Sequence, residues 1–90
     1  MKFFDSPEMR QTLKRYLRAQ MSIKNIDYRS LSQRLAKLGV EQTEGTLRNK
    51  INKGNLGAQL FMYLLLALDV KALDLAQIEE LLTDIEREMQ

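Results

Sequence analysis

The stretch YRSLSQRLAKLGVEQTEGTLRNKINKG, residues 28–54, decides how this chain folds. Its first half carries three leucines at spacings of four and three, namely Leu31, Leu35 and Leu38. This period predicts an amphipathic helix. Asp27 precedes it and can act as N-cap, because its carboxylate accepts a backbone N–H that the helix leaves unpaired. Gly39 suits the left-handed conformation that ends a helix, so the first half is one short helix.

The second half of the stretch is a polar, basic helix. Thr43 is a candidate N-cap and Gly54 a candidate C-terminal glycine, which predicts a helix from about Glu44 to Lys53. Leu47 and Ile51 are its only apolar residues, and at a spacing of four they lie on one face. A helix with so narrow an apolar face leaves its other faces for contact with another molecule.

Three segments within Tyr28–Val70 resemble a known family: LSQRLAKLGV, LRNKINKG and LLLALDV. They are similar to the helix-turn-helix of lambda-repressor-like DNA-binding domains, in which a helix ends in Gly, a polar recognition helix ends in Gly, and an apolar helix follows. The resemblance implies an all-α fold, a compact bundle of about five helices. It also implies that the helix from Glu44 contacts double-stranded DNA. The connection between the first two helices is longer here than in the family.

The outward positions of this polar helix follow from a rotation of about 100° per residue. If Leu47 and Ile51 point inward, Asn49 and Asn52 point outward, and Arg48 lies on a flank. Asn can pair with adenine in a major groove, and flanking cations suit phosphates. Including the preceding connection, the candidate DNA-binding residues are Gln42, Thr43, Gly45, Thr46, Arg48, Asn49, Lys50, Asn52 and Lys53.

Gly45 lies in the first turn of this helix, where it costs up to about 1 kcal/mol relative to Ala. Two explanations are open. The missing side chain allows the helix N-terminus to approach a phosphate closely, or it avoids a clash inside the fold.

Further helices flank this unit. Ser6 and Pro7 suit the start of a first helix, whose apolar stripe is Met9, Leu13, Tyr16, Leu17 and Met21. Ile23 and Ile26 follow it and are expected to pack inward. The helix predicted at about Ala58–Leu68 is apolar on every side, so both of its faces should be covered. The second cover is the C-terminal helix, a second subunit, or both.

The C-terminal helix begins after Asp74 and carries apolar residues at alternating spacings of three and four. This seam, packed on the helix before it, predicts a homodimer, although packing within one chain stays open. The predicted dimerisation residues are Met62, Leu66, Leu75, Ile78, Leu82, Ile85 and Met89. Residues 1–72 then form the helix-turn-helix domain, and residues 73–90 a C-terminal amphipathic helix packed on it.

The composition excludes several kinds of site. The 90 residues contain no Cys and no His, which removes disulfides, the usual zinc ligands, thiol nucleophiles and imidazole bases. We therefore expect no cofactor, no metal and no enzymatic activity. The start MKFFD lacks a signal-peptide core, and the longest uncharged apolar run, Leu60–Leu68, is far short of the ~20 residues of a membrane span. A cytoplasmic protein without a membrane contact is the simplest interpretation.

The charge is divided unevenly along the chain. Residues 1–54 hold twelve Lys and Arg against five Asp and Glu, a net charge of +7. Residues 55–90 hold two against seven, a net charge of −5. Because the basic half contains the polar helix, this division favours a nucleic-acid-binding face.

The leading hypothesis is a sequence-specific double-stranded DNA-binding protein, a small dimeric transcriptional regulator that acts by occupying an operator. The alternative is a protein-interaction module with the same fold, an adaptor or toxin-neutralising partner, that does not bind DNA. The longer connection and the modest overall charge of +2 keep this alternative open. RNA binding is disfavoured because no exposed aromatic pair offers a platform for base stacking.

Overall fold

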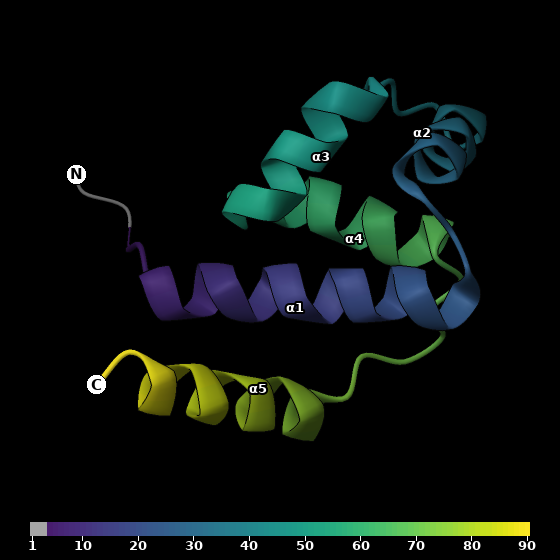
Figure 1. The fold of residues 1–90 in the computed structure, drawn as a ribbon. Coiled ribbons are helices and arrows are strands. Elements are labelled where there is room, and N and C mark those ends of the chain that lie inside the picture. Colours follow the sequence, from purple (N-terminus) through teal and green to yellow (C-terminus); the bar gives the residue numbers. More distant parts are fainter. Residues whose placement is uncertain (1–3) are drawn as a thin grey trace.

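Five α-helices make up the fold of residues 4–90, which are the residues that the computed structural model describes. They are α1 (Pro7–Lys24), α2 (Tyr28–Lys37), α3 (Glu44–Lys53), α4 (Ala58–Ala67) and α5 (Leu75–Glu88), and this range contains no strand (Figure 1). The prediction of an all-α bundle of about five helices is confirmed. The first three residues of the predicted domain 1–72 lie outside the described residues.

α1 runs through the middle of the molecule, with α5 on one side and the group α2, α3 and α4 on the other (Figure 1). The core between α1 and this group consists of fully or nearly fully buried side chains: Tyr16, Leu17, Leu31, Leu35, Leu47, Ile51, Leu64 and Leu68. Thr12 is buried as well, and its hydroxyl donates to the Glu8 carbonyl at 2.8 Å. Leu31 and Leu35 of the predicted leucine face therefore pack inward. Leu38 does not: it is 44% exposed, because α2 ends at Lys37 and Leu38 is its C-cap.

The predicted N-caps form hydrogen bonds at the starts of the helices. Ser6 Oγ accepts from the Met9 N–H at 3.1 Å, with Pro7 as first residue of α1. Asp74 Oδ1 accepts from the Ala76 N–H at 3.0 Å. These side chains satisfy donors that a helix cannot pair internally, which explains why both helices start where the sequence predicts.

α1, α2 and α4 end in the same way. A residue in the left-handed region follows each helix, namely Asn25 (φ 55°), Gly39 (φ 85°) and Asp69 (φ 57°). The next residue is apolar, and its N–H donates to a carbonyl five residues earlier: Ile26 to Met21, Val40 to Leu35 and Val70 to Leu65, at 2.8 to 2.9 Å. All three apolar residues are buried or pack against the core. This C-terminal motif turns the chain sharply and returns it to the core.

Ile23 departs from its prediction. It is 72% exposed, whereas Ile26 is buried as expected. α1 continues to Lys24, so Ile23 lies on the solvent side of its last turn rather than in the connection.

The C-terminal end of α4 is stabilised by cations from two other helices. α4 has no basic residue in its own last turn. Arg34 Nη1 of α2 donates to the Ala67 carbonyl at 3.2 Å, and Lys24 Nζ at the end of α1 donates to the Asp69 carbonyl at 3.0 Å. A positive charge beside the negative end of a helix is favourable, so these contacts tie α4 to α1 and α2.

The predicted packing of the C-terminal helix on the helix before it is wrong, because α5 packs along α1. Within the described residues, α4 and α5 make no close backbone contact. Ile85 is 1% exposed, and Ile78 and Leu82 are half-buried. These three predicted dimerisation residues therefore face their own chain. The other four, Met62, Leu66, Leu75 and Met89, are exposed.

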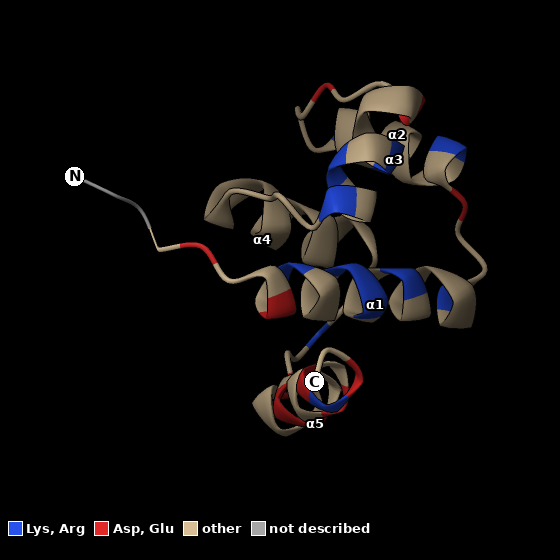
Figure 2. Cartoon of the chain, turned by 60° about the vertical axis from the view of Figure 1, so that its left-hand side comes forward, with Lys and Arg blue, Asp and Glu red and all other residues tan. Residues whose placement is uncertain are grey.

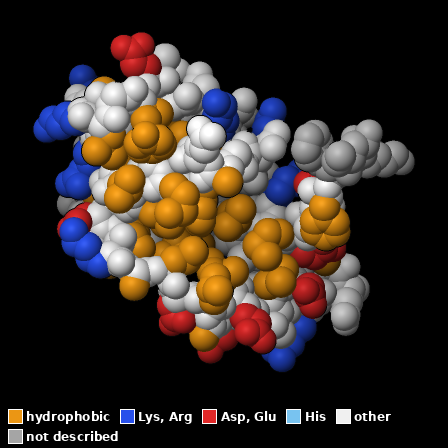
Figure 3. Space-filling view, turned by 180° about the vertical axis from the view of Figure 1, so that it is seen from behind, with side chains coloured by type: hydrophobic (Ala, Val, Ile, Leu, Met, Phe, Trp, Pro, Cys, Tyr) orange, Lys and Arg blue, Asp and Glu red, His pale blue; other side chains and the backbone are white. Residues whose placement is uncertain are grey.

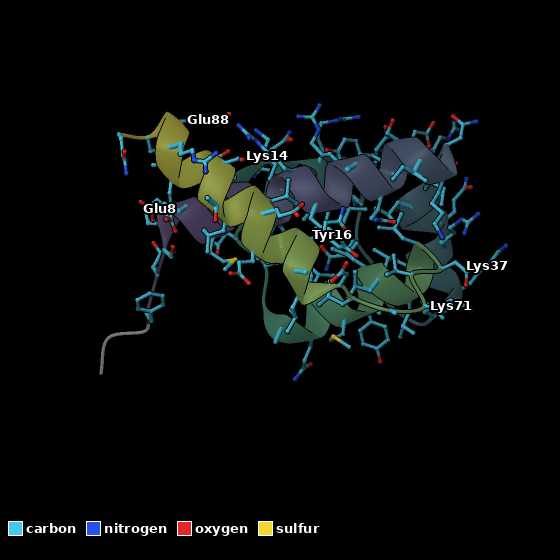
Figure 4. All side chains as sticks on the ribbon, turned by 90° about the horizontal axis from the view of Figure 1, so that it is seen from below. Glu8, Lys14, Tyr16, Lys37, Lys71 and Glu88 are labelled. Carbon is cyan, nitrogen blue, oxygen red and sulfur yellow. The ribbon has the colours of Figure 1, made fainter. Side chains whose placement is uncertain are left out.

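Opposite charge favours the packing of α5 on α1, in addition to the burial of Ile85. From the sequence, α1 carries a net charge of +4 and α5 a net charge of −4. The Arg15 guanidinium and the Glu88 carboxylate form a bidentate ion pair, with N–O distances of 3.3 and 2.5 Å. The hydrogen bond to Glu88 raises the pKa of Arg15 above its ordinary value. Figure 4 shows α5 crossing α1. No helix of residues 4–90 is both long and apolar enough to cross a bilayer.

Candidate functional site

The connection between α2 and α3 is held to α2 at both of its ends. Gly39 donates to the Ala36 carbonyl at 3.0 Å, and Val40 packs against the core. Near the other end, Ser32 Oγ of α2 donates to the Gln42 carbonyl at 2.5 Å. These contacts fix the direction in which α3 leaves the connection.

α3 has the predicted bounds and the predicted inward face. Thr43 Oγ1 accepts from the Thr46 N–H at 3.1 Å as N-cap, and Gly54 ends the helix in the left-handed region at φ 64°. Leu47 and Ile51 are both fully buried. Gly54, the residue that follows α3, lies against the main chain of Arg10 in α1. α3 is thus fixed by two side chains and one backbone contact, and its remaining faces are free.

Seven of the nine candidate DNA-binding residues are exposed on this free side, namely Thr43, Gly45, Thr46, Arg48, Asn49, Asn52 and Lys53. Their side chains offer hydroxyl and amide groups that both donate and accept hydrogen bonds, flanked by cations. We call Thr46, Arg48, Asn49, Asn52 and Lys53 the α3 face.

The other two candidates, Gln42 and Lys50, are half-buried. The side-chain oxygen of Gln42 is buried and has no hydrogen-bond partner among the described residues. Lys50 lines a shallow hollow between α3 and α4 together with Gln42, Gln59 and Tyr63. These two candidates are therefore less accessible to another molecule than the seven exposed ones.

Arg48 is held in place by two neighbours that the sequence analysis missed. Its Nη2 pairs with Glu44 Oε1 at 3.0 Å, one helical turn earlier. Its guanidinium carbon lies 5.2 Å from the centre of the Tyr28 ring, at the start of α2. The i, i+4 spacing of Glu44 and Arg48 could have revealed the ion pair, whereas the ring contact depends on how α2 and α3 pack.

Gly45 has open space around it. A Cβ built there meets no atom within 4 Å, so the explanation by a clash inside the fold is wrong. The glycine leaves the backbone of the first turn of α3 uncovered. Thr43 and Thr46, on either side of it, are joined by a hydroxyl–hydroxyl bond of 2.8 Å.

The three-dimensional arrangement changes how the charge asymmetry is understood. Because α5 lies on α1, its carboxylates offset the cations of that helix (Figure 2). The segment 27–54, which contains α2 and α3, holds six Lys and Arg against three Asp and Glu and keeps a net charge of +3. Within residues 4–90, no three Asp or Glu side chains come together as a metal site requires. The α3 face is a surface for polar recognition with a modest positive potential.

Comparison with known proteins gives one match. The model of a family described as a domain of unknown function (DUF6471) matches residues 9–73, which extend from α1 through α4 and end before α5. No curated protein and no solved structure matches the chain.

Proposed function

The chain belongs to the family described as a domain of unknown function (DUF6471), and from the geometry of α2 and α3 we propose that it is a sequence-specific double-stranded DNA-binding protein. In this proposal, α2 and α3 are the two helices of a lambda-repressor-like helix-turn-helix, and α3 is the recognition helix. A bound operator would be closed to other proteins, so the protein would regulate transcription by occupancy.

The observation that carries the proposal is the combination of a buried and an exposed face on α3. Leu47 and Ile51 are fully buried, while the opposite side exposes Asn49 and Asn52. Asn pairs bidentately with adenine, and a short helix fits the major groove of B-form DNA. Arg48 and Lys53 flank the asparagines and suit phosphates on either side of the groove.

The arrangement around Gly45 supports the same proposal. The helix N-terminus carries a partial positive charge and unpaired N–H groups, which bind phosphate. Because nothing lies within 4 Å of a Cβ built at Gly45, a phosphate oxygen could approach the first turn of α3 directly. Arg48, held between Glu44 and the Tyr28 ring on the flank of α3, would contact a phosphate beside the groove.

One observation favours a different function. α4 exposes an apolar face, which also suits a protein-interaction module, an adaptor or toxin-neutralising partner, without DNA binding. Such a module should have no affinity for duplex DNA at low salt, whereas a DNA-binding protein should bind it. A DNA-binding measurement therefore distinguishes the two functions.

The test is a set of binding curves on duplexes selected from a random pool, measured over a range of salt concentrations. Binding should weaken steeply with salt, because each neutralised phosphate releases condensed counterions. Arg48→Ala and Lys53→Ala should each weaken binding to all sequences and reduce the salt slope. Asn49→Ala should cost about 1–3 kcal/mol at one preferred base pair and leave nonspecific binding nearly unchanged.

Lys71→Ala is the matched control for lost charge, because Lys71 is exposed and lies in the connection after α4. In Figure 4, Lys71 and Lys37 are both labelled at the end of the molecule away from Glu8 and Glu88. Lys71→Ala should leave binding unchanged. If Asn49→Ala and Thr46→Ala bind the selected duplex as tightly and selectively as the parent, α3 is not the recognition helix. If no duplex is bound at low salt, the DNA-binding proposal is overturned and the protein-interaction module is the function to test next.

A further inference from the structure

One face of α4 is apolar and lies open on the side of the molecule seen in Figure 3. Met62 is 56% exposed, Leu66 is 62% exposed and Tyr63 is 40% exposed. These three line a shallow hollow with Ala58 and Gln59, and we call the five residues the α4 face. Leu73 and Leu75, in the segment that follows α4, are also exposed.

No part of the described chain covers the α4 face. The C-terminal helix α5, which was expected to cover it, packs on α1 instead. Soluble monomers seldom expose a contiguous apolar patch of this kind, and such patches mark surfaces that bind another protein. Figure 3 shows the hydrophobic side chains gathered in the middle of this face, with charged side chains at its edges.

We propose that a second copy of the chain covers the α4 face, so that the protein is a two-fold symmetric dimer in which α4 packs against α4. The reason is charge. α4 contains no Asp, Glu, Lys or Arg, whereas each of the other four helices of residues 4–90 has a net charge of at least two units. In a two-fold contact the same surface meets itself, so any charged helix would face its own sign. α4 is the helix that can meet its own copy without this repulsion.

The order of residues along α4 is also complementary to itself. Ala58, Met62 and Leu66 are four residues apart and form one row along the helix. In an antiparallel pair with Met62 at the two-fold axis, Ala58 of each copy lies opposite the partner's Leu66, a small side chain against a large one. The antiparallel arrangement also sets the positive end of each helix beside the negative end of the other.

The dimer does not depend on DNA binding. None of the five residues of the α4 face belongs to α3, so the proposed dimer contact and the α3 face use different helices. The interface keeps Met62 and Leu66 of the predicted dimerisation residues but not the seam on the C-terminal helix, because Ile78, Leu82 and Ile85 face their own chain.

The first test is sedimentation equilibrium of the full chain without DNA. The parent should sediment as a dimer at micromolar concentration. Met62→Lys and Leu66→Lys should each raise the dissociation constant by about 30-fold or more, the effect of losing a central interface residue. Both residues are exposed in the single chain, so circular dichroism should show unchanged helix content. Ile23→Lys is the matched control: Ile23 is exposed and apolar but lies at the end of α1, and the dimer should persist.

A second test distinguishes a second copy from any other occupant. Met62→Lys and Met62→Glu should each be monomeric alone, because two like charges meet at the axis. Mixed in equal amounts they should form a heterodimer, since opposite charges then meet. A parent chain that remains monomeric at high micromolar concentration overturns the proposal. A dimer that tolerates both lysine substitutions, or a mixture that stays monomeric, overturns it equally.

Discussion

Gly54, at the end of α3, lies directly against the carbonyl group of Arg10 in α1. A Cβ built on Gly54 would stand 2.0 Å from the Arg10 oxygen and 2.6 Å from its carbonyl carbon. The atoms in the way are backbone atoms of a helix and cannot move aside as a side-chain end can. The absence of a side chain at residue 54 therefore sets how closely α3 approaches α1, and with it the position of the α3 face.

Gly54→Ala should destabilise the domain by about 3 kcal/mol or more, because left-handed strain adds to the overlap with Arg10. Urea unfolding followed by circular dichroism measures this change. If the variant is as stable as the parent, α3 and α1 can move apart at no cost in free energy. The close contact at Gly54 then does not set the position of α3.

Gly45→Ala is the opposite case and serves as its control. The space around residue 45 is open and the helix favours Ala, so the variant should be as stable as the parent or up to about 1 kcal/mol more stable. It should nonetheless bind selected duplex DNA more weakly, because the methyl group blocks the approach of a phosphate to the helix N-terminus. A variant with unchanged DNA affinity would contradict the phosphate contact at Gly45.

Leu47→Ala should lower the free energy of unfolding by about 2–5 kcal/mol, because the leucine is fully buried and its removal leaves a cavity. The change is read from urea unfolding curves at equal protein concentration. Asn49→Ala, two positions away on the exposed side, should shift stability by no more than about 0.5 kcal/mol. Similar losses for both substitutions would mean that the inward and outward faces of α3 are assigned wrongly.

Ile85→Ala should destabilise each protomer by about 2–5 kcal/mol, since Ile85 is buried between α5 and α1. Leu75→Ala removes an apolar side chain that is 69% exposed on the same helix and should have little effect on unfolding. The comparison distinguishes packing of α5 within its own chain from a dimer formed through the apolar residues of α5. If Ile85→Ala dissociates a dimer but leaves the monomer's thermal unfolding unchanged, α5 lies between subunits.

Asp27 makes the start of α2 sensitive to acid. The hydrogen bond from the Ser30 N–H lowers the pKa of its carboxyl group below the ordinary value of 3.8. The charged cap therefore stabilises the fold above the unfolded pKa, and this contribution is lost as the pH falls through the folded pKa. Asp27→Asn keeps a capping oxygen without the charge.

Thermal unfolding of the parent and of Asp27→Asn should be compared at several pH values. The parent should lose stability more steeply than Asp27→Asn between about pH 5 and pH 2. All other carboxylates titrate in both proteins, so they cancel in the difference. Parallel curves would show that the Asp27 carboxylate contributes nothing through its charge.

The local structure was predictable because each signal lies within a few residues. Ser6, Asp27, Thr43 and Asp74 cap helices where the sequence predicts, since an N-cap needs only its own side chain and a backbone N–H two or three positions later. Gly39 and Gly54 take the predicted left-handed conformations for the same reason. The burial of Leu47 and Ile51 follows from helical period alone. Five helices, their bounds and the inward face of α3 were therefore readable from the sequence.

The tertiary structure alone decided which surfaces meet. The spacing of apolar residues in α5 is compatible with packing on α4, on a second subunit or on α1. In the structure α5 packs on α1, whose net charge is opposite to its own. The contacts of Arg34 with Ala67, and of Arg48 with Tyr28, join residues 33 and 20 positions apart. The open space at Gly45 and the close contact at Gly54 are likewise set by neighbouring helices. These contacts between helices depend on how several helices pack together. The hydrogen bonds and the spacing of apolar residues within one helix do not determine that packing.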